Sequence, residues 1–69
     1  MKIFAERLKL LREEKGISQQ ELALEIGSIV TRSAIGYYEL GRRVPGFDAV
    51  IAIAKYFGVT TDYLAGLED

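Results

Sequence analysis

Residues 28–38 read SIVTRSAIGYY, and this stretch decides how the whole chain is interpreted. It combines aliphatic residues, two adjacent tyrosines and a single charge with a glycine where a helix would favour another residue. On a helical wheel Ala34, Ile35 and Tyr38 share one face, and Val30 can close over the N-terminal end of that face. We expect this apolar face to be buried in a core.

The opposite face of the same helix has an unusual composition. Arg32, Ser33, Gly36 and Tyr37 follow one another at i, i+1, i+4 and i+5. A face that meets only water is normally rich in Lys, Glu and Gln, and a glycine within a helix costs about 1 kcal/mol relative to alanine. A guanidinium, a hydroxyl, bare backbone and a phenol are groups suited to close contact with a partner.

Glycines divide the rest of the chain into short helical segments. Five of the seven stand where an amphipathic pattern stops, as glycine commonly does after a helix, namely Gly16, Gly27, Gly41, Gly58 and Gly66. The spacing of apolar residues predicts a first helix ending near Lys15 and four more, at Gln19 to Ile26, Arg32 to Leu40, Asp48 to Phe57 and Asp62 to Ala65. The sequence therefore predicts an all-α fold of five helices.

Polar residues mark the expected starts of three of these helices. Ser18-Gln19-Gln20-Glu21 is a capping box for the second helix, and Thr31 is a suitable N-cap for the third. Either Thr60 or Thr61 can cap the fifth. We interpret Pro45-Gly46 as a turn pair before the fourth helix.

Composition restricts the function classes. The chain has 69 residues, so we expect residues 1–69 to form a single domain. It contains neither Cys nor His, which removes disulfides, thiolate metal sites and the commonest general base. Glu13 and Glu14 are adjacent and point apart on a helix, and no glycine-rich phosphate loop is present. We therefore expect no enzyme activity, no cofactor and no metal.

The compartment and the charge distribution are the remaining constraints. The longest apolar run, Ala49 to Ala54, is too short to span a membrane, and charges interrupt the N-terminus too early for a signal peptide. We expect a cytoplasmic protein. The net charge is −1, yet residues 31–46 carry Arg32, Arg42 and Arg43 against Glu39 alone. Such a local excess occurs on ordinary solvated faces as well, so charge alone does not identify a nucleic-acid binder.

Several motifs together identify a resemblance. They are Ser18-Gln19-x-x-Leu22-Ala23, Arg32-Ser33-Ala34-Ile35-Gly36-Tyr37-Tyr38-Glu39-x-Gly41, Arg42-x-x-Pro45, Ile53-Ala54-Lys55-Tyr56-Phe57-Gly58-Val59 and Thr61-Asp62-Tyr63-Leu64. In this order and register they resemble the phage-repressor (Cro- and Xre-like) helix-turn-helix family, whose fold is the lambda-repressor-like domain. The resemblance extends over nearly the whole chain, from Phe4 to Leu67.

The resemblance implies a sequence-specific regulator of transcription, usually a repressor, that binds double-stranded DNA as a homodimer on a near-palindromic operator. The third helix of such proteins enters the major groove, and the second lies across the backbone. The residues implied to meet bases are Arg32, Ser33, Gly36 and Tyr37. Those implied to meet phosphates are Gln19, Thr31, Arg42 and Arg43, and Gln19 is also a candidate to brace the reading helix. Arg12 and Glu39 correspond to an internal ion pair.

One departure from the family pattern concerns the turn between the second and third helices. Relatives usually place one residue between the glycine and the next N-cap, whereas Ser28, Ile29 and Val30 separate Gly27 from Thr31 here. Either the turn is longer, or the third helix begins at Ser28. The choice affects how the two helices dock on DNA, including any phosphate contact near residue 28.

Two further questions remain open at this level. Tyr63, Leu64 and Leu67 are candidates for the homodimer contact, although Leu64 could instead complete the core of one subunit. The same fold could also serve as a protein-interaction module, antitoxin-like or polymerase-binding, with DNA secondary. The acidic net charge favours that alternative slightly.

Overall fold

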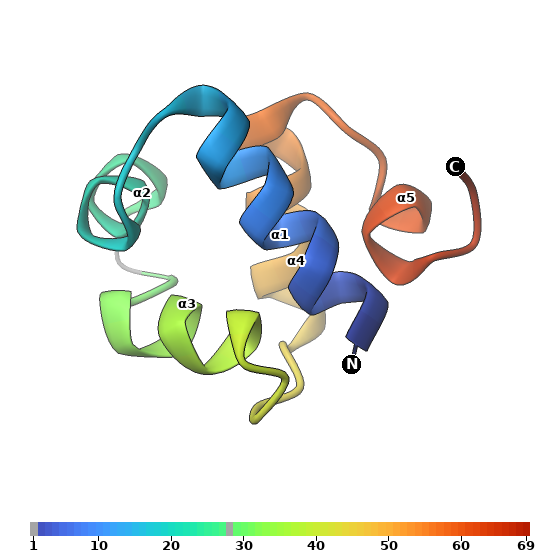
Figure 1. Ribbon diagram of the computed structural model, residues 1–69, viewed down its shortest axis with the longest axis horizontal. Helices are drawn as coiled ribbons and strands as arrows, with labels where there is room; N and C mark the ends of the chain where they lie inside the picture. Colours follow the sequence, from blue (N-terminus) through green and yellow to red (C-terminus); the bar gives the residue numbers. More distant parts are fainter. Residues whose placement is uncertain (1, 28) are drawn as a thin grey trace.

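The computed structural model describes residues 2–27 and 29–69, and these residues form five α-helices (Figure 1). The helices are α1 (Lys2–Lys15), α2 (Gln19–Ile26), α3 (Arg32–Glu39), α4 (Phe47–Phe57) and α5 (Thr61–Ala65). The predicted all-α fold of five helices is confirmed. Three boundaries differ by one residue: α3 ends one residue before the prediction, and α4 and α5 each begin one residue earlier.

Side-chain caps fix the helix starts. The Ser18 hydroxyl oxygen accepts from the Glu21 N–H at 3.0 Å, and the Glu21 carboxylate accepts from the Ser18 N–H at 2.9 Å, so the capping box is present. Thr31 accepts from the Ala34 N–H at 3.1 Å and caps α3. Thr60 accepts from the Tyr63 N–H at 2.9 Å, which makes Thr60 rather than Thr61 the cap of α5.

The turn between α2 and α3 is the longer of the two alternatives. Helix α3 begins at Arg32, directly after its N-cap Thr31, and therefore does not start at Ser28. Ser28 and the phosphate contact considered near it lie outside the described residues. Val30 is 1% exposed and anchors the turn in the core, while Ile29 is exposed. At the start of α4, Gly46 serves as the N-cap and Pro45 is buried, so the expected turn pair is part of the helix start itself.

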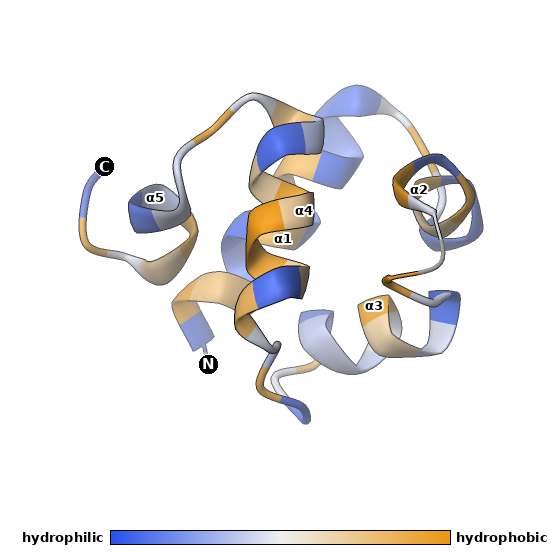
Figure 2. Ribbon diagram, turned by 180° about the vertical axis from the view of Figure 1, so that it is seen from behind, coloured by the Kyte–Doolittle hydropathy of each residue, from blue (hydrophilic) through white to orange (hydrophobic). Residues whose placement is uncertain are grey.

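All five helices contribute to one hydrophobic core. Its fully buried side chains are Phe4, Leu8, Leu22, Val30, Ile35, Ile53 and Leu64. Helices α1 and α4 occupy the middle of the molecule, with α2 and α3 on one side and α5 on the other, and α4 is apolar along most of its length (Figures 1 and 2).

Helix α3 is held by its apolar face. It packs against α1 and α2, its residue Ile35 is fully buried, and the Tyr38 ring meets the Phe4 ring edge-on with centroids 5.8 Å apart. The predicted burial of Ala34, Ile35 and Tyr38 is confirmed. Because the apolar face of α3 is buried against α1 and α2, the opposite face of α3 points away from the core.

An ion pair joins α1 to the end of α3. The Arg12 guanidinium donates to both carboxylate oxygens of Glu39, at 2.7 and 3.0 Å, and also to the Ile17 carbonyl oxygen at 2.9 Å. The two side chains are only 13% and 5% exposed. Hydrogen bonding to the Glu39 carboxylate raises the pKa of Arg12 above its ordinary value, so the guanidinium stays charged.

A second polar contact connects α2 to α4. The Tyr56 hydroxyl donates to the Glu25 carboxylate at 2.5 Å, and the Lys15 ammonium lies 4.8 Å from the centre of the Tyr56 ring. The hydrogen bond to the carboxylate, with some loss of solvation and the nearby negative charge, raises the pKa of Tyr56 to about 12. Helix α2, which carries Gln19, is therefore held from two sides.

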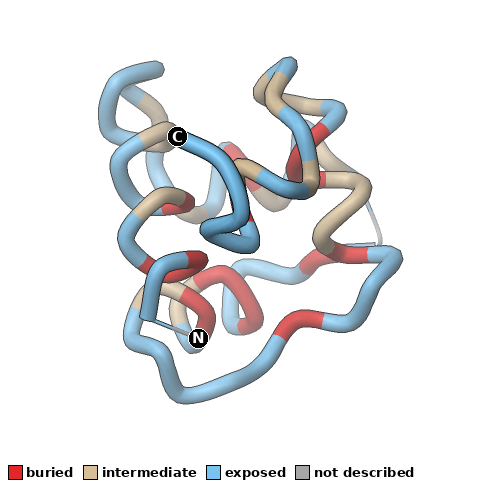
Figure 3. The backbone as a smooth tube through the Cα atoms, turned by 90° about the vertical axis from the view of Figure 1, so that its right-hand side faces the viewer, coloured by how far each residue is buried: buried red, intermediate tan, exposed pale blue. Residues whose placement is uncertain are grey.

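The C-terminal helix decides between the two alternatives given for Leu64. Leu64 is fully buried and belongs to the monomer core, so it is removed from the expected dimer contact. Tyr63 is half-buried beneath the Arg7 guanidinium, which lies 4.4 Å from the ring centre, whereas Leu67 is 77% exposed. The segment after α5 lies at the outer surface (Figure 3). Among the described residues, no helix combines the length and the apolar character needed to cross a membrane.

Substitution of two glycines by alanine is expected to have opposite effects on stability. A Cβ at Gly36 would meet only the Gln19 side-chain oxygen, at an ordinary 3.5 Å, so Gly36→Ala should raise the free energy of unfolding by up to about 1 kcal/mol. Gly58 has φ +68° at the end of α4, and Gly58→Ala should lower that free energy by about 1–2 kcal/mol. Urea unfolding of both variants measures the two signs, and a destabilised Gly36→Ala would show that α3 has less room than described.

Removal of the Glu39 carboxylate is expected to destabilise the domain. In Glu39→Ala the Arg12 guanidinium stays partly buried without its partner, and a loss of about 1–3 kcal/mol follows. Urea unfolding at neutral pH measures this loss, with Glu14→Ala on the exposed side of α1 as the matched control. A Glu39→Ala protein as stable as the control would contradict a stabilising role for the pair.

Candidate nucleic-acid interface

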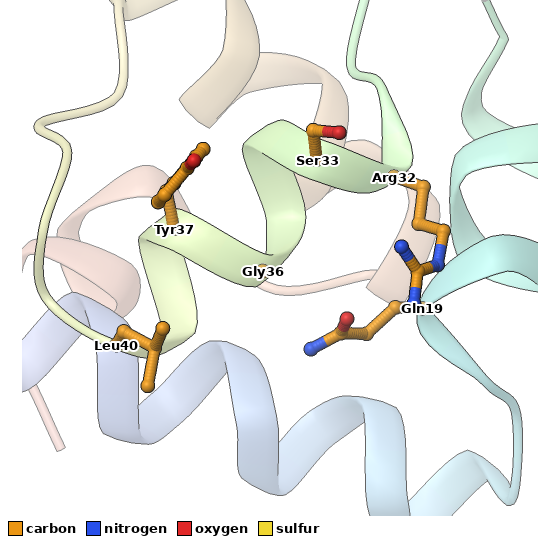
Figure 4. A pocket seen from close by; sticks show the side chains of 6 residues that line it. All are labelled: Gln19, Arg32, Ser33, Gly36, Tyr37 and Leu40. Atoms are coloured by element: carbon orange, nitrogen blue, oxygen red, sulfur yellow. The ribbon is translucent and has the colours of Figure 1, made fainter.

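The outward face of α3 carries a cluster of groups able to contact a partner. Arg32, Ser33 and Tyr37 are exposed, and Gly36 is half-buried between them. Together with Gln19 from α2 and Leu40 they line an open hollow of about 220 Å³, which we call the reading hollow (Figure 4). The structure thus brings all four residues implied to meet bases to one side of one helix.

Two helices contribute to the reading hollow. The Arg32 side chain extends from the start of α3 towards α2, the Gln19 side chain extends from α2 towards the middle of α3, and Tyr37 and Leu40 lie towards the other end of α3 (Figure 4). Gly36 lies between the two groups. The Gln19 side-chain oxygen lies 3.5 Å from where a Cβ of residue 36 would stand, which is an ordinary van der Waals distance.

Gln19 is hydrogen-bonded to the ion pair between Arg12 and Glu39. Its side-chain nitrogen donates to the Glu39 carboxylate at 3.1 Å, and the same carboxylate oxygen accepts from Arg12 at 3.0 Å. Gln19 therefore does brace the third helix, through the side chain of Glu39. The ion pair itself lies behind the reading hollow and does not line it.

The remaining residues implied to meet phosphates flank this face. Arg42 and Arg43 are exposed in the loop after α3, and the Arg43 guanidinium lies 5.0 Å from the centre of the Tyr37 ring. The Thr31 hydroxyl oxygen accepts the capping hydrogen bond from Ala34, which leaves the Thr31 hydroxyl proton available for an outside acceptor. Arg43 thus belongs to the same surface as Tyr37.

The electrostatics of this side differ from those of the whole chain. Glu39 is the only acid within residues 31–46, and its carboxylate is buried and neutralised by Arg12. The arginines at 32, 42 and 43 are exposed on the same stretch without an exposed acid between them. A chain with a net charge of −1 therefore presents a locally positive surface.

Two features of the interface were missed by reasoning from sequence alone. Leu40 lines the reading hollow and is 67% exposed, although it was expected only as the last residue of the helix. Leu40 follows Gly36 by four residues and Arg32 by eight, and this helical spacing could have placed it on the same face. The resemblance implied that Gln19 braces the third helix, but the sequence did not indicate Glu39 as its partner, because that contact depends on how α2 packs on α3.

Comparison with known proteins agrees with this geometry. A sequence profile described as helix-turn-helix matches residues 8–64. A prophage-derived uncharacterized HTH-type transcriptional regulator of Bacillus subtilis, YonR, is 40% identical over 62 residues, which is 90% of this chain and 56% of the relative. A second uncharacterized HTH-type transcriptional regulator of B. subtilis, YqaE, is 40% identical over the same share of the chain and 52% of its own length.

A third relative carries a more specific name. The HTH-type transcriptional activator BcrR of Enterococcus faecalis is 36% identical over 66 residues, or 96% of this chain and 31% of BcrR. No solved structure matches significantly. The chain spans about half the length of the B. subtilis relatives. It belongs to the helix-turn-helix family of DNA-binding transcriptional regulators.

Proposed function

We propose that this domain recognises one DNA sequence by inserting α3 into the major groove, with Arg32, Ser33, Gly36 and Tyr37 facing base edges. The observation that carries the proposal is the division of α3 into a fully packed apolar face and an outward face that contains no acid. A helix with one dry face and one protruding polar face is the element that helix-turn-helix proteins place in the groove.

Each group on this face has a chemical counterpart in DNA. The forked guanidinium of Arg32 suits the O6 and N7 acceptors of guanine, and the Ser33 hydroxyl serves either a donor or an acceptor. The bare backbone at Gly36 lets the helix approach closely. Gln19, Thr31, Arg42 and Arg43 supply the donors for phosphate oxygens around the groove.

Repression as a homodimer is the regulatory mode that we propose. Occupying an operator requires only a DNA-binding face and a contact between subunits, whereas activation also requires a surface for the transcription machinery. Near-palindromic half-sites one helical turn apart follow from two-fold symmetry. For the subunit contact we propose Tyr63 with two exposed apolar residues, Leu67, which is 77% exposed, and Ile3, which is 45% exposed and adjacent to Gly66. We place this function in the cytoplasm, without catalysis or cofactor.

A protein-interaction module is the alternative function. Leu24 and Ile29 are 71% and 58% exposed on the side of α2 and the following turn, and a hollow lined by Ala23, Leu24 and Val30 lies there. A protein partner that binds this mainly apolar surface would form few contacts between charged groups, so its affinity would depend only weakly on salt concentration. The affinity of arginine side chains for DNA phosphates, in contrast, falls steeply as the salt concentration rises.

Selection of bound sequences from random duplex DNA tests the proposed function. We expect enrichment of a two-fold symmetric sequence whose affinity falls steeply between low and physiological salt. Random-sequence duplex of equal length is the control for non-specific binding. Absence of any enriched sequence, with affinity independent of salt, would favour the interaction module.

Arg32→Ala is expected to remove one base preference. The loss of a bidentate contact to guanine should cost about 1–3 kcal/mol at one position of each half-site and flatten the preference there. Titration of the selected duplex and of duplexes changed at single positions measures this effect. Arg32 is exposed in the first turn of α3, so the thermal stability of Arg32→Ala should stay near that of the wild type. An unchanged preference at every position would exclude Arg32 from base recognition.

Arg42→Ala and Arg43→Ala are expected to differ although the residues are adjacent. Both should weaken binding to operator and to random duplex, and each should reduce the salt slope by about one unit, because each removes a phosphate contact. Arg43 also stacks on Tyr37, so only Arg43→Ala should additionally change the base preference contributed by Tyr37. Affinities measured across a salt series give both quantities. If Arg42→Ala changes a base preference while keeping the slope, its assignment to phosphate is wrong.

A further inference from the structure

The polar network behind α3 continues to the reading hollow. Glu39 accepts from Arg12 on one side and from the Gln19 side-chain nitrogen on the other, the latter at 3.1 Å. The Glu39 side chain is only 5% exposed, too deep to reach DNA itself. Gln19, by contrast, lines the reading hollow.

We propose that Glu39 is a positioning residue for DNA binding, which acts by holding the Gln19 amide in the orientation that contacts the duplex. The inference rests on the proposed DNA-binding function and adds to it a link between the buried ion pair and one contact residue. An ion pair of this kind is otherwise a stabilising contact between α1 and α3 only.

The carboxylate determines which way the amide points. An ionised carboxylate only accepts hydrogen bonds, so the NH₂ group of Gln19 must face Glu39 and its oxygen must face the other way. That oxygen lies over Gly36, 3.5 Å from the position of a Cβ. Glu39 therefore sets the orientation of the amide by supplying the acceptor for its NH₂ group.

This orientation leaves one donor for DNA. The NH₂ group has two hydrogens, and only one is used by Glu39. The second can donate to a phosphate oxygen at the edge of the groove, where α2 crosses the backbone. A side chain already fixed in the free protein loses less freedom on binding, so loss of the Glu39 acceptor should weaken operator binding by about two- to tenfold.

A double-mutant cycle on operator affinity separates positioning from stability. Glu39→Met should weaken binding about two- to tenfold in the wild-type background and have no further effect in the Gln19→Ala background, because the group it positions is absent. Affinities are measured well below the melting temperature of each variant so that only folded protein is compared. An equal loss in both backgrounds would overturn the proposal.

Two variants serve as controls. Arg12→Met removes the same ion pair but leaves the Glu39 carboxylate to accept from Gln19, so it should lower stability and keep operator affinity near the wild-type value. Should Arg12→Met weaken binding as much as Glu39→Met, the ion pair acts only through the fold. Glu39→Asp keeps the charge near Arg12 while withdrawing the acceptor from Gln19, and it replaces Glu39→Met if that variant does not fold.

The free wild-type protein provides a test that needs no variant. The two side-chain amide protons of Gln19 should have widely separated NMR shifts and the relaxation of a rigid group, unlike those of the exposed Gln20. Averaged, mobile signals for Gln19 would overturn the proposal even if the protein binds DNA. If Gln19 is rigid but selection enriches no duplex that the protein binds, the result would instead count against the proposed function.

Discussion

The burial of one carboxylate constrains much of this structure. Glu39 stands at the end of α3 with 5% of its side chain exposed, and such a charge is tolerable only with close opposite charge and hydrogen bonds. Arg12 satisfies this requirement from α1, and Gln19 adds a donor from α2. The requirement therefore fixes three helices relative to one another at the point where the orientation of the reading helix matters. Hydrophobic packing alone is not directional and would specify that orientation less narrowly.

The same burial explains how an acidic chain presents a basic surface. Withdrawal of the single acid of residues 31–46 from solvent leaves the arginines of that stretch unopposed where DNA would approach. The remaining acids lie outside this stretch, among them Glu13 on α1, Glu25 on α2 and Asp62 on α5. Net charge is thus a poor indicator of DNA binding for a domain this small, because the position of each charge matters more than the sum.

Most of the architecture was predictable from the sequence because local signals and packing agree. The capping box at Ser18, the cap at Thr31 and the glycines after each helix all occur as expected, and the apolar face of α3 is buried. The expectations that changed depend on long-range packing. Leu64 is a core residue because α5 packs against α1 and α4, and Leu40 lines the reading hollow because it stays exposed directly after α3. The contact between Gln19 and Glu39 spans 20 residues of sequence and has no periodic pattern.

The division of α3 into two faces has a consequence for how such a domain can change its target. The residues that hold α3 in place and the residues that face outward are different residues, so substitutions at 32, 33 and 37 alter the surface offered to DNA without opening the core. Under the proposed function, new binding specificities are therefore accessible by single substitutions at little cost in stability. Position 36 is the exception: a longer side chain there meets the Gln19 amide, and a change of specificity at that position also disturbs a contact shared by two helices.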